Sequence, residues 1–125
     1  MKFIADLHLH SHFSMATSKQ LTPEFLDKWG RIKGIKLIGT GDFTHPGWLS
    51  ELKEKLEPAE PGLYRLKEEF KLPCFVPETT ENSVRFILTA EISNIYKKQG
   101  KVRKVHSLLL APGFQEAEDI QQVLQ

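Results

Sequence analysis

Residues 21–39 read LTPEFLDKWGRIKGIKLIG, which predicts a helix followed at once by a short strand. Thr22 is a suitable N-cap, and Pro23 takes the first helical position, where its missing N–H costs nothing. Gly34 is a suitable end, because glycine readily adopts the left-handed conformation that terminates many helices. The expected apolar stripe of the helix comprises Phe25, Leu26, Trp29 and Ile32.

The flanking sequence extends this pattern into an α/β fold. Residues 3–9 alternate apolar and polar side chains, as a strand does, so a strand–helix–strand unit is complete by Gly39. Such βαβ units pair their strands in parallel. The further expected elements are a helix from Pro46, strands over 63–70 and 84–90, an exposed connection over 77–82, a hairpin pairing 92–96 with 102–110 around Gln99-Gly100, and a helix after Pro112-Gly113 with Ala117, Ile120, Val123 and Leu124 on one side.

Composition excludes several classes of protein. Seventeen basic and sixteen acidic residues leave a net charge of +1, so a strongly basic nucleic-acid binder is excluded and any basic surface is local. The sequence contains no apolar run of the roughly 20 residues that a membrane span needs, and no signal peptide. Cys74 is the single cysteine, which excludes an internal disulfide and predicts a cytoplasmic location.

The length of the chain sets a further expectation. A closed β/α barrel needs about 250 residues, whereas this sequence has 125 and about three βα steps. We therefore expect residues 1–125 to be the N-terminal part of a longer protein. An incomplete sheet exposes an edge and an apolar face, so self-association of this fragment is also expected.

The pair His8 and His10 is the first candidate site. On a strand, residues i and i+2 project from the same face, so both imidazoles can meet one metal ion. Asp6 shares this face, and the pair follows the first strand at the carboxyl edge of the sheet, where catalytic groups of β/α folds gather. The alternative is a solvated strand end, and His12 is expected to be a supporting or surface residue.

The stretch Gly39-Thr40-Gly41-Asp42-Phe43-Thr44-His45-Pro46 follows the second strand at the same edge. Asp42 and His45 are both metal-competent, and the two glycines allow close approach of the backbone. The alternative is that an Asp or Thr ahead of Pro46 only caps the next helix.

Glu91 and His106 are candidates on later strands. A carboxylate at the end of an apolar strand is costly to bury unless it is paired or bound to metal, and Glu91 follows such a strand at 84–90. His106 lies in a strand-like segment. The alternatives are a surface glutamate that opens the hairpin and a histidine satisfied within the core.

A basic run surrounds the expected hairpin turn. Its five members are Lys97, Lys98, Lys101, Arg103 and Lys104. One hypothesis is a local phosphate-binding surface beside the metals. The other is a solvated tip that protects the sheet edge. The sequence has no P-loop, no dinucleotide fingerprint and no nucleophile elbow.

Together these residues resemble the PHP (polymerase and histidinol phosphatase) family of metal-dependent phosphoesterases. Asp6-Leu7-His8-Leu9-His10-Ser11 is similar to the first motif of that family, and Gly41-Asp42 to His45 is similar to the second, which more often joins its aspartate and histidine directly. Glu91 and His106 match the middle glutamate and the histidine that follows it. The resemblance is strongest to the endonuclease Q branch, which shares the segments 39–46, 88–96 and the basic hairpin.

The resemblance implies the N-terminal part of a distorted (β/α)7 barrel with a β-hairpin insertion. It implies two or three zinc or manganese ions, held by His8, His10, Asp42, His45, Glu91 and His106, with Asp42 and Glu91 as catalytic residues. It also implies a hydrolase that binds DNA and cleaves phosphodiesters 5′ to deaminated bases. The later family ligands, a histidine and a final Asp-x-His, have no counterpart after His106, so this fragment alone is expected to be inactive.

Two other functions stay open at this point. One is a PHP phosphatase that acts on a small phosphomonoester. The other is a non-catalytic PHP module that metal ions stabilise within a larger protein.

Overall fold

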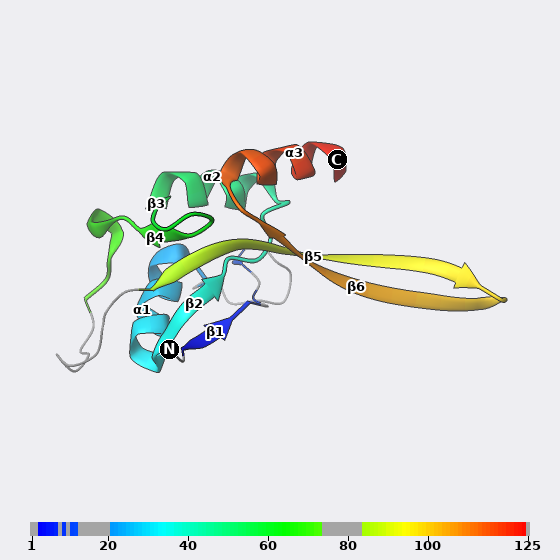
Figure 1. Cartoon of the computed structure of the whole chain (residues 1–125), viewed down its shortest axis with the longest axis horizontal. Helices are drawn as coiled ribbons and strands as arrows, with labels where there is room; N and C mark the ends of the chain where they lie inside the picture. The colour runs from blue at the N-terminus through cyan, green and yellow to red at the C-terminus, as the bar shows by residue number, and fades with distance from the viewer. Residues whose placement is uncertain (1–2, 8, 10, 13–20, 74–83, 125) are drawn as a thin grey trace.

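The structure is a computed structural model that describes residues 3–7, 9, 11–12, 21–73 and 84–124, with the side chains of residues 93–98, 103–105 and 124 excepted. Its elements are, in order, β1 (Ile4–Asp6), α1 (Pro23–Lys33), β2 (Ile35–Gly39), α2 (Pro46–Lys55), β3 (Leu56–Pro58), β4 (Tyr64–Leu66), the 3-10 helix η1 (Glu68–Phe70), β5 (Arg85–Lys98), β6 (Lys101–Ala111) and α3 (Phe114–Leu124). Figure 1 shows their arrangement.

The strands form one mixed sheet in the order β1-β2-β5-β4-β3, with β6 paired to β5. β1 and β2 are parallel, as the βαβ prediction requires, and β2 is also parallel to β5. β3 and β4 pair in an antiparallel manner, as do β4 and β5. The fold is therefore mixed α/β with a mixed sheet.

Helix α1 forms where the sequence predicts it. The Oγ1 atom of Thr22 accepts a hydrogen bond from the backbone N–H of Phe25 at 3.3 Å, and Gly34 ends the helix at φ 75°. The prediction that Ile32 belongs to the apolar stripe was wrong, because its side chain is 53% exposed. The buried face instead continues through Gly30, where a Cβ would lie 2.9 Å from the Cδ1 atom of Ile38.

Three other expectations were wrong in detail. The first strand is shorter than 3–9, and Phe3 and Ile4 are exposed because β1 lies at the edge of the sheet. The expected strand at 63–70 divides into β4 and the η1 turn. β3 was not predicted from the sequence. This strand ends in Pro58, and proline is found in edge strands but not in central ones. The expected connection at 77–82, and Cys74, lie outside the described residues.

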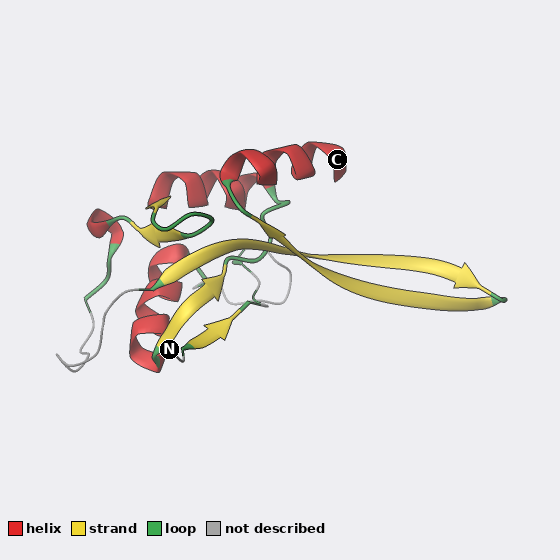
Figure 2. Ribbon diagram, in the orientation of Figure 1, coloured by secondary structure: helices red, strands yellow, loops and turns green. Residues whose placement is uncertain are grey.

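The expected hairpin is longer than the sequence indicates. The expected strand at 84–90 is the first part of β5, which continues without a break to Lys98. The prediction that Glu91 ends a strand was therefore wrong. β5 and β6 pair from Leu88 opposite Ala111 to Lys98 opposite Lys101. Gln99 and Gly100 have φ values of 52° and 76°, as the predicted tight turn requires. Figure 2 shows the two strands extending far from the helices.

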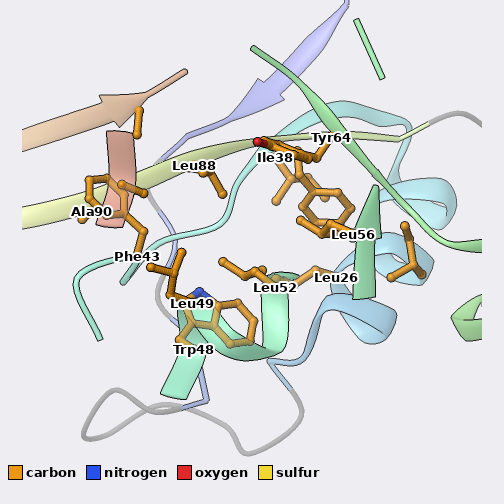
Figure 3. Close-up of a cluster of buried hydrophobic side chains, with 14 of the residues drawn as sticks. Leu26, Ile38, Phe43, Trp48, Leu49, Leu52, Leu56, Tyr64, Leu88 and Ala90 are labelled. Atoms are coloured by element: carbon orange, nitrogen blue, oxygen red, sulfur yellow. The ribbon is translucent and has the colours of Figure 1, made fainter. Parts of the chain in front are cut away.

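The core lies between the helices and the sheet, and Figure 3 shows its main side chains. Its largest buried apolar residues are Trp48, Phe43, Phe86, Leu26, Ile38, Leu52, Leu66 and Leu88. Helix α3 adds Ala117, which is buried, but Val123 is 82% exposed, contrary to expectation. Within the described part of the chain, no helix is both long and apolar enough to cross a membrane.

Asp27 is a buried carboxyl group that makes the stability of the fold depend on pH. Its side chain is 1% exposed and pairs with Arg31 at 2.9 Å. Burial raises the pKa of Asp27 and outweighs the opposing influence of Arg31 and Lys71. The folded chain therefore binds this proton more tightly than the unfolded chain, and the contribution to stability is lost as pH rises from 3.8 through the folded pKa.

We expect Asp27→Asn to remove this contribution. Urea unfolding at several pH values should show the free energy of unfolding of the variant rising relative to that of the parent as pH increases through this window. Glu60→Gln is the control of opposite sign, because a hydrogen bond from Arg85 lowers the pKa of Glu60. A difference between parent and Asp27→Asn that does not change with pH would contradict the assignment.

Candidate metal and phosphoester site

The candidate site lies where the parallel strands β1 and β2 end. Gly39, the last residue of β2, brings the segment after β1 close, because a Cβ there would lie 2.5 Å from the carbonyl oxygen of Leu7. Leu9 packs against the core, and Ser11 is fully buried. His8 and His10, between these residues, lie outside the described residues, so their metal binding stays a prediction.

Asp42 occupies a constrained turn at this edge. It is a non-glycine residue at φ 51°, in the left-handed region that side chains other than those of Asn and Asp rarely adopt. Gly41 N–H donates to Thr89 Oγ1 at 2.8 Å, and Phe43 N–H donates to the carbonyl oxygen of Thr89 at 3.2 Å. The backbone on both sides of Asp42 is thus held by β5, which brings Asp42 to the strand that carries Glu91.

The Asp42 carboxylate is oriented by Ser11. Its Oδ2 atom accepts hydrogen bonds from the Ser11 N–H at 2.7 Å and from the Ser11 hydroxyl at 2.8 Å. Two donors on one oxygen stabilise the ionised carboxylate and fix its direction. The contact also joins the segment after β1 to the turn after β2, across 31 residues of sequence.

Helix α2 holds both of these segments. The indole N–H of the buried Trp48 donates to the carbonyl oxygens of Gly41 at 2.7 Å and Thr40 at 3.2 Å. The His12 ring meets the Trp48 ring edge-on at 5.5 Å, and His12 Nε2 lies 2.8 Å from Glu51 Oε1. His12, expected to be a supporting or surface residue, is therefore a supporting one.

Lys55 continues this network. Its Nζ atom lies 3.1 Å from Glu51 Oε2 and 2.8 Å from Glu24 Oε1. Burial acts to lower the pKa of Lys55, but the hydrogen bonds to Glu24 and Glu51 outweigh it and raise the pKa above its usual value. Lys55 is therefore held as a cation, which fixes Glu51 and through it His12.

His45 caps α2. Its Nδ1 atom accepts hydrogen bonds from the N–H groups of Gly47 at 3.1 Å and Trp48 at 3.4 Å. A neutral ring that accepts at Nδ1 carries its proton on Nε2. Coordination of a metal through either ring nitrogen would therefore require loss of this cap, and coordination through Nε2 would also require a change of tautomer. The helix is thus capped by His45 and not by an Asp or Thr, so the capping alternative was wrong in its residue.

Glu91 and His106 form a pair at the base of the hairpin. Glu91 Oε1 lies 2.7 Å from His106 Nδ1. The side chain of His106 is 51% exposed, so the alternative of a histidine satisfied within the core was wrong. These two candidates, 15 residues apart in the sequence, thus meet across β5 and β6.

The five basic candidates lie at the far end of the hairpin. In the β5–β6 register, Lys98 is opposite Lys101, Tyr96 is opposite Arg103 and Ile95 is opposite Lys104. Lys101 is exposed, whereas the side chains of the other four lie outside the described residues. The backbone thus separates the basic run from Asp42 and the Glu91–His106 pair.

The donor types at this edge suit zinc or manganese, since they are carboxylate oxygens and imidazole nitrogens. A catalytic zinc site uses three protein ligands and an open position for water. Among the described residues, however, no three His, Cys, Asp or Glu side chains converge on one point. The described donors therefore fit part of such a site, to which further ligands would have to be added.

Sequence reasoning missed the residues that support the candidates. Ser11, Thr40, Thr89 and Trp48 are fully buried. Thr89 N–H donates to Thr40 Oγ1 at 3.2 Å, which completes the contact between the turn and β5. None of these residues belongs to a periodic pattern that separates them from ordinary strand or helix residues. The HxH pair directly before Ser11 was the one available signal.

No family model matches the chain. The solved structure of PfuEndoQ, a lesion-specific endonuclease from Pyrococcus furiosus, is similar with a TM-score of 0.70 and 29% identity, over 95% of this chain and 24% of that one. An uncharacterized protein from Methanocaldococcus jannaschii, MJ0043, is 53% identical over 49 residues, which are 39% of this chain and 6% of that protein.

A second solved structure is endonuclease Q in complex with a 27-mer duplex substrate that has an abasic lesion at the active site. Its TM-score is 0.71 and its identity 29%, over 97% of this chain and 25% of that one. The chain thus spans about a quarter of the length of the solved structures it matches. Over nearly all of its described length, it has a mixed α/β fold similar to that of endonuclease Q.

Proposed function

We propose that this chain is part of a metal-dependent DNA repair endonuclease that cleaves phosphodiesters 5′ to deaminated bases, and that it forms the N-terminal portion of a PHP-type phosphoesterase domain. The observation that carries the proposal is the similarity to two endonuclease Q structures over 95% and 97% of the chain. One of those structures contains a DNA duplex with a lesion at its active site, which supports DNA as the partner here.

The site geometry supports the same function. Asp42 lies in the turn after β2 and the Glu91–His106 pair lies on β5 and β6, yet they are linked through Thr89, which bonds to both neighbours of Asp42. With His8 and His10, these residues would hold two or three zinc or manganese ions, and His45 would join them after giving up its cap. Such ions lower the pKa of a bound water and screen the charge of the phosphate.

The residues of the chain itself have distinct parts in this proposal. Ser11 fixes the direction of the Asp42 carboxylate, since its N–H and its hydroxyl both donate to Oδ2. Glu91 Oε1 lies 2.7 Å from His106 Nδ1, so each of these side chains orients the other. Asp42 and Glu91 are the proposed catalytic residues, because both are carboxylates that would hold the metal ions on which hydrolysis of the phosphodiester would depend.

We expect the purified, unchelated chain to contain zinc or manganese, bound through His8 and His10. Elemental analysis should give a content that falls by most of its value in the double variant His8→Ala/His10→Ala. Far-UV circular dichroism of both proteins controls for folding. Equal metal content in the parent and a folded double variant would contradict the assignment. Occupancy below one ion per chain is compatible with it, because the described ligands are incomplete.

The substrate class is tested with the natural protein that carries these residues. A preference for p-nitrophenyl phosphate over lesion-containing DNA would favour a small-molecule phosphatase instead. Metal binding at His8 and His10 without hydrolysis of either substrate would favour a non-catalytic module.

A further inference from the structure

We propose that the outer part of the hairpin lies along the DNA duplex beside the cleavage site and sets how many base pairs the protein needs on that side. This outer part, the arm, comprises residues 92–107, beyond the pair of Glu91 and Leu108. The inference rests on the proposed function and names the part of the DNA that the arm contacts. Figure 1 shows the arm as a narrow extension of the body.

The charge distribution selects the arm as the contact with a polyanion. Five basic residues occupy the eight positions 97–104. With 17 basic and 16 acidic residues in the whole chain, twelve basic and sixteen acidic ones remain elsewhere, a net charge of −4. The body therefore repels DNA on average, and attraction is concentrated at the tip.

The shape of the arm suits a duplex. In the part of the chain that the structure describes, β5 contacts β2 as far as Ile87 and β4 at Phe86, and farther out it pairs with β6 alone. A two-stranded ribbon fits the major groove of DNA, which is about 12 Å wide. The turn at Gln99 and Gly100 is exposed and has the positive φ values that match the twist of a ribbon.

The positions of the basic residues along the arm predict how far from the cleavage site the arm contacts DNA. Counted from Glu91, the level of Lys104 lies four strand residues out, and that of Lys98 and Lys101 seven. At about 3.4 Å per strand residue, these levels lie roughly 14 to 24 Å beyond Glu91. Since DNA rises about 3.4 Å per base pair, the arm would contact phosphates about four to seven base pairs from the site.

The test measures binding of the chain to duplexes that carry one deaminated base and flanks of increasing length on either side. Affinity should rise with the flank on one side and stop rising at about seven base pairs. A lengthened arm has Thr-Val inserted between Asn94 and Ile95 and again between Lys104 and Val105. Two residues per strand preserve the pleat and the pairing, and they move the tip outward by about 6.8 Å.

The lengthened arm should shift this plateau by about two base pairs. It keeps every lysine and arginine of the arm and changes only their distance from Glu91. A second, charge-based comparison does not depend on the insertion folding. Lys97→Gln/Lys98→Gln/Lys101→Gln should lower the slope of log affinity against log salt by up to about 2.7, which is 0.9 for each phosphate left without its lysine. The matched control, which replaces Lys28, Lys33 and Lys67 of the body with glutamine, should leave the slope near that of the parent.

Two results would overturn the inference. The first is tight DNA binding in which the folded lengthened arm has the same plateau as the parent, or in which the two lysine variants have equal salt slopes. This result would reject the role of the arm and leave the proposed function standing. Absence of DNA binding by both the chain and the natural protein that carries it would reject the proposed function together with the arm.

Discussion

Replacement of Trp48 by alanine is expected to lower the free energy of unfolding by about 3–5 kcal/mol, the usual result of removing a buried aromatic side chain. Trp48 is fully buried, and its N–H is the donor that holds the carbonyl oxygens of Thr40 and Gly41. A loss of this size is a large part of the roughly 5–15 kcal/mol that stabilises an ordinary domain. Urea unfolding followed by circular dichroism measures the change.

Two further variants separate packing from hydrogen bonding. Trp48→Phe keeps most of the ring but leaves two buried carbonyl oxygens without this donor, which should cost about 1–3 kcal/mol. Trp29→Ala is the matched control, because Trp29 is only partly buried and packs at the margin of the core. Equal losses for Trp29→Ala and Trp48→Ala would show that Trp48 has no special part in the turn that carries Asp42.

Gly39→Ala is expected to destabilise the chain by about 1–3 kcal/mol, the range for atoms forced into a packed region. The added Cβ would lie 2.5 Å from the carbonyl oxygen of Leu7 and 2.9 Å from its Cα. Both are backbone atoms, so relief requires the segment after β1 to move away from β2. Because His8 and His10 follow Leu7 directly, metal content should fall together with stability.

Gly113→Ala is the control for a short contact as such. A Cβ at Gly113 would lie 2.7 Å from Oε2 of Glu116, the far end of a flexible side chain that can turn aside. This variant should therefore stay within about 0.5 kcal/mol of the parent, as most substitutions away from special features do. A Gly39→Ala protein as stable as Gly113→Ala, with unchanged metal content, would show that the close approach of Leu7 is not needed.

Local chemistry made much of the fold predictable. The helix at 23–33 follows from Thr22, Pro23 and Gly34, whose preferences act within a few residues, and the turn at Gln99-Gly100 follows in the same way. The predictions of strands were wrong where contacts with other parts of the fold decide the length and the burial of a strand. β1 alternates like a half-buried strand, yet Phe3 and Ile4 are exposed because β1 lies at a sheet edge.

The candidate site was predictable in part for the same reason. Parallel strands bring their carboxyl ends to one edge, so Asp42 could be assigned to that edge from the order of elements alone. The pairing of Glu91 with His106 depends on the hairpin register, and the Ser11–Asp42 contact depends on a close approach at Gly39. Neither register nor close approach is encoded in the spacing of residues along the chain.

The most direct test of the account maps the DNA product of the natural protein that carries these 125 residues. An end-labelled duplex with a single uracil or hypoxanthine, incubated with manganese, should be nicked on the 5′ side of that base, and Asp42→Asn should lower the rate by orders of magnitude while leaving the fold intact. Contradiction would come from a natural protein that leaves this duplex uncut, or from an Asp42→Asn variant that nicks it at the parental rate.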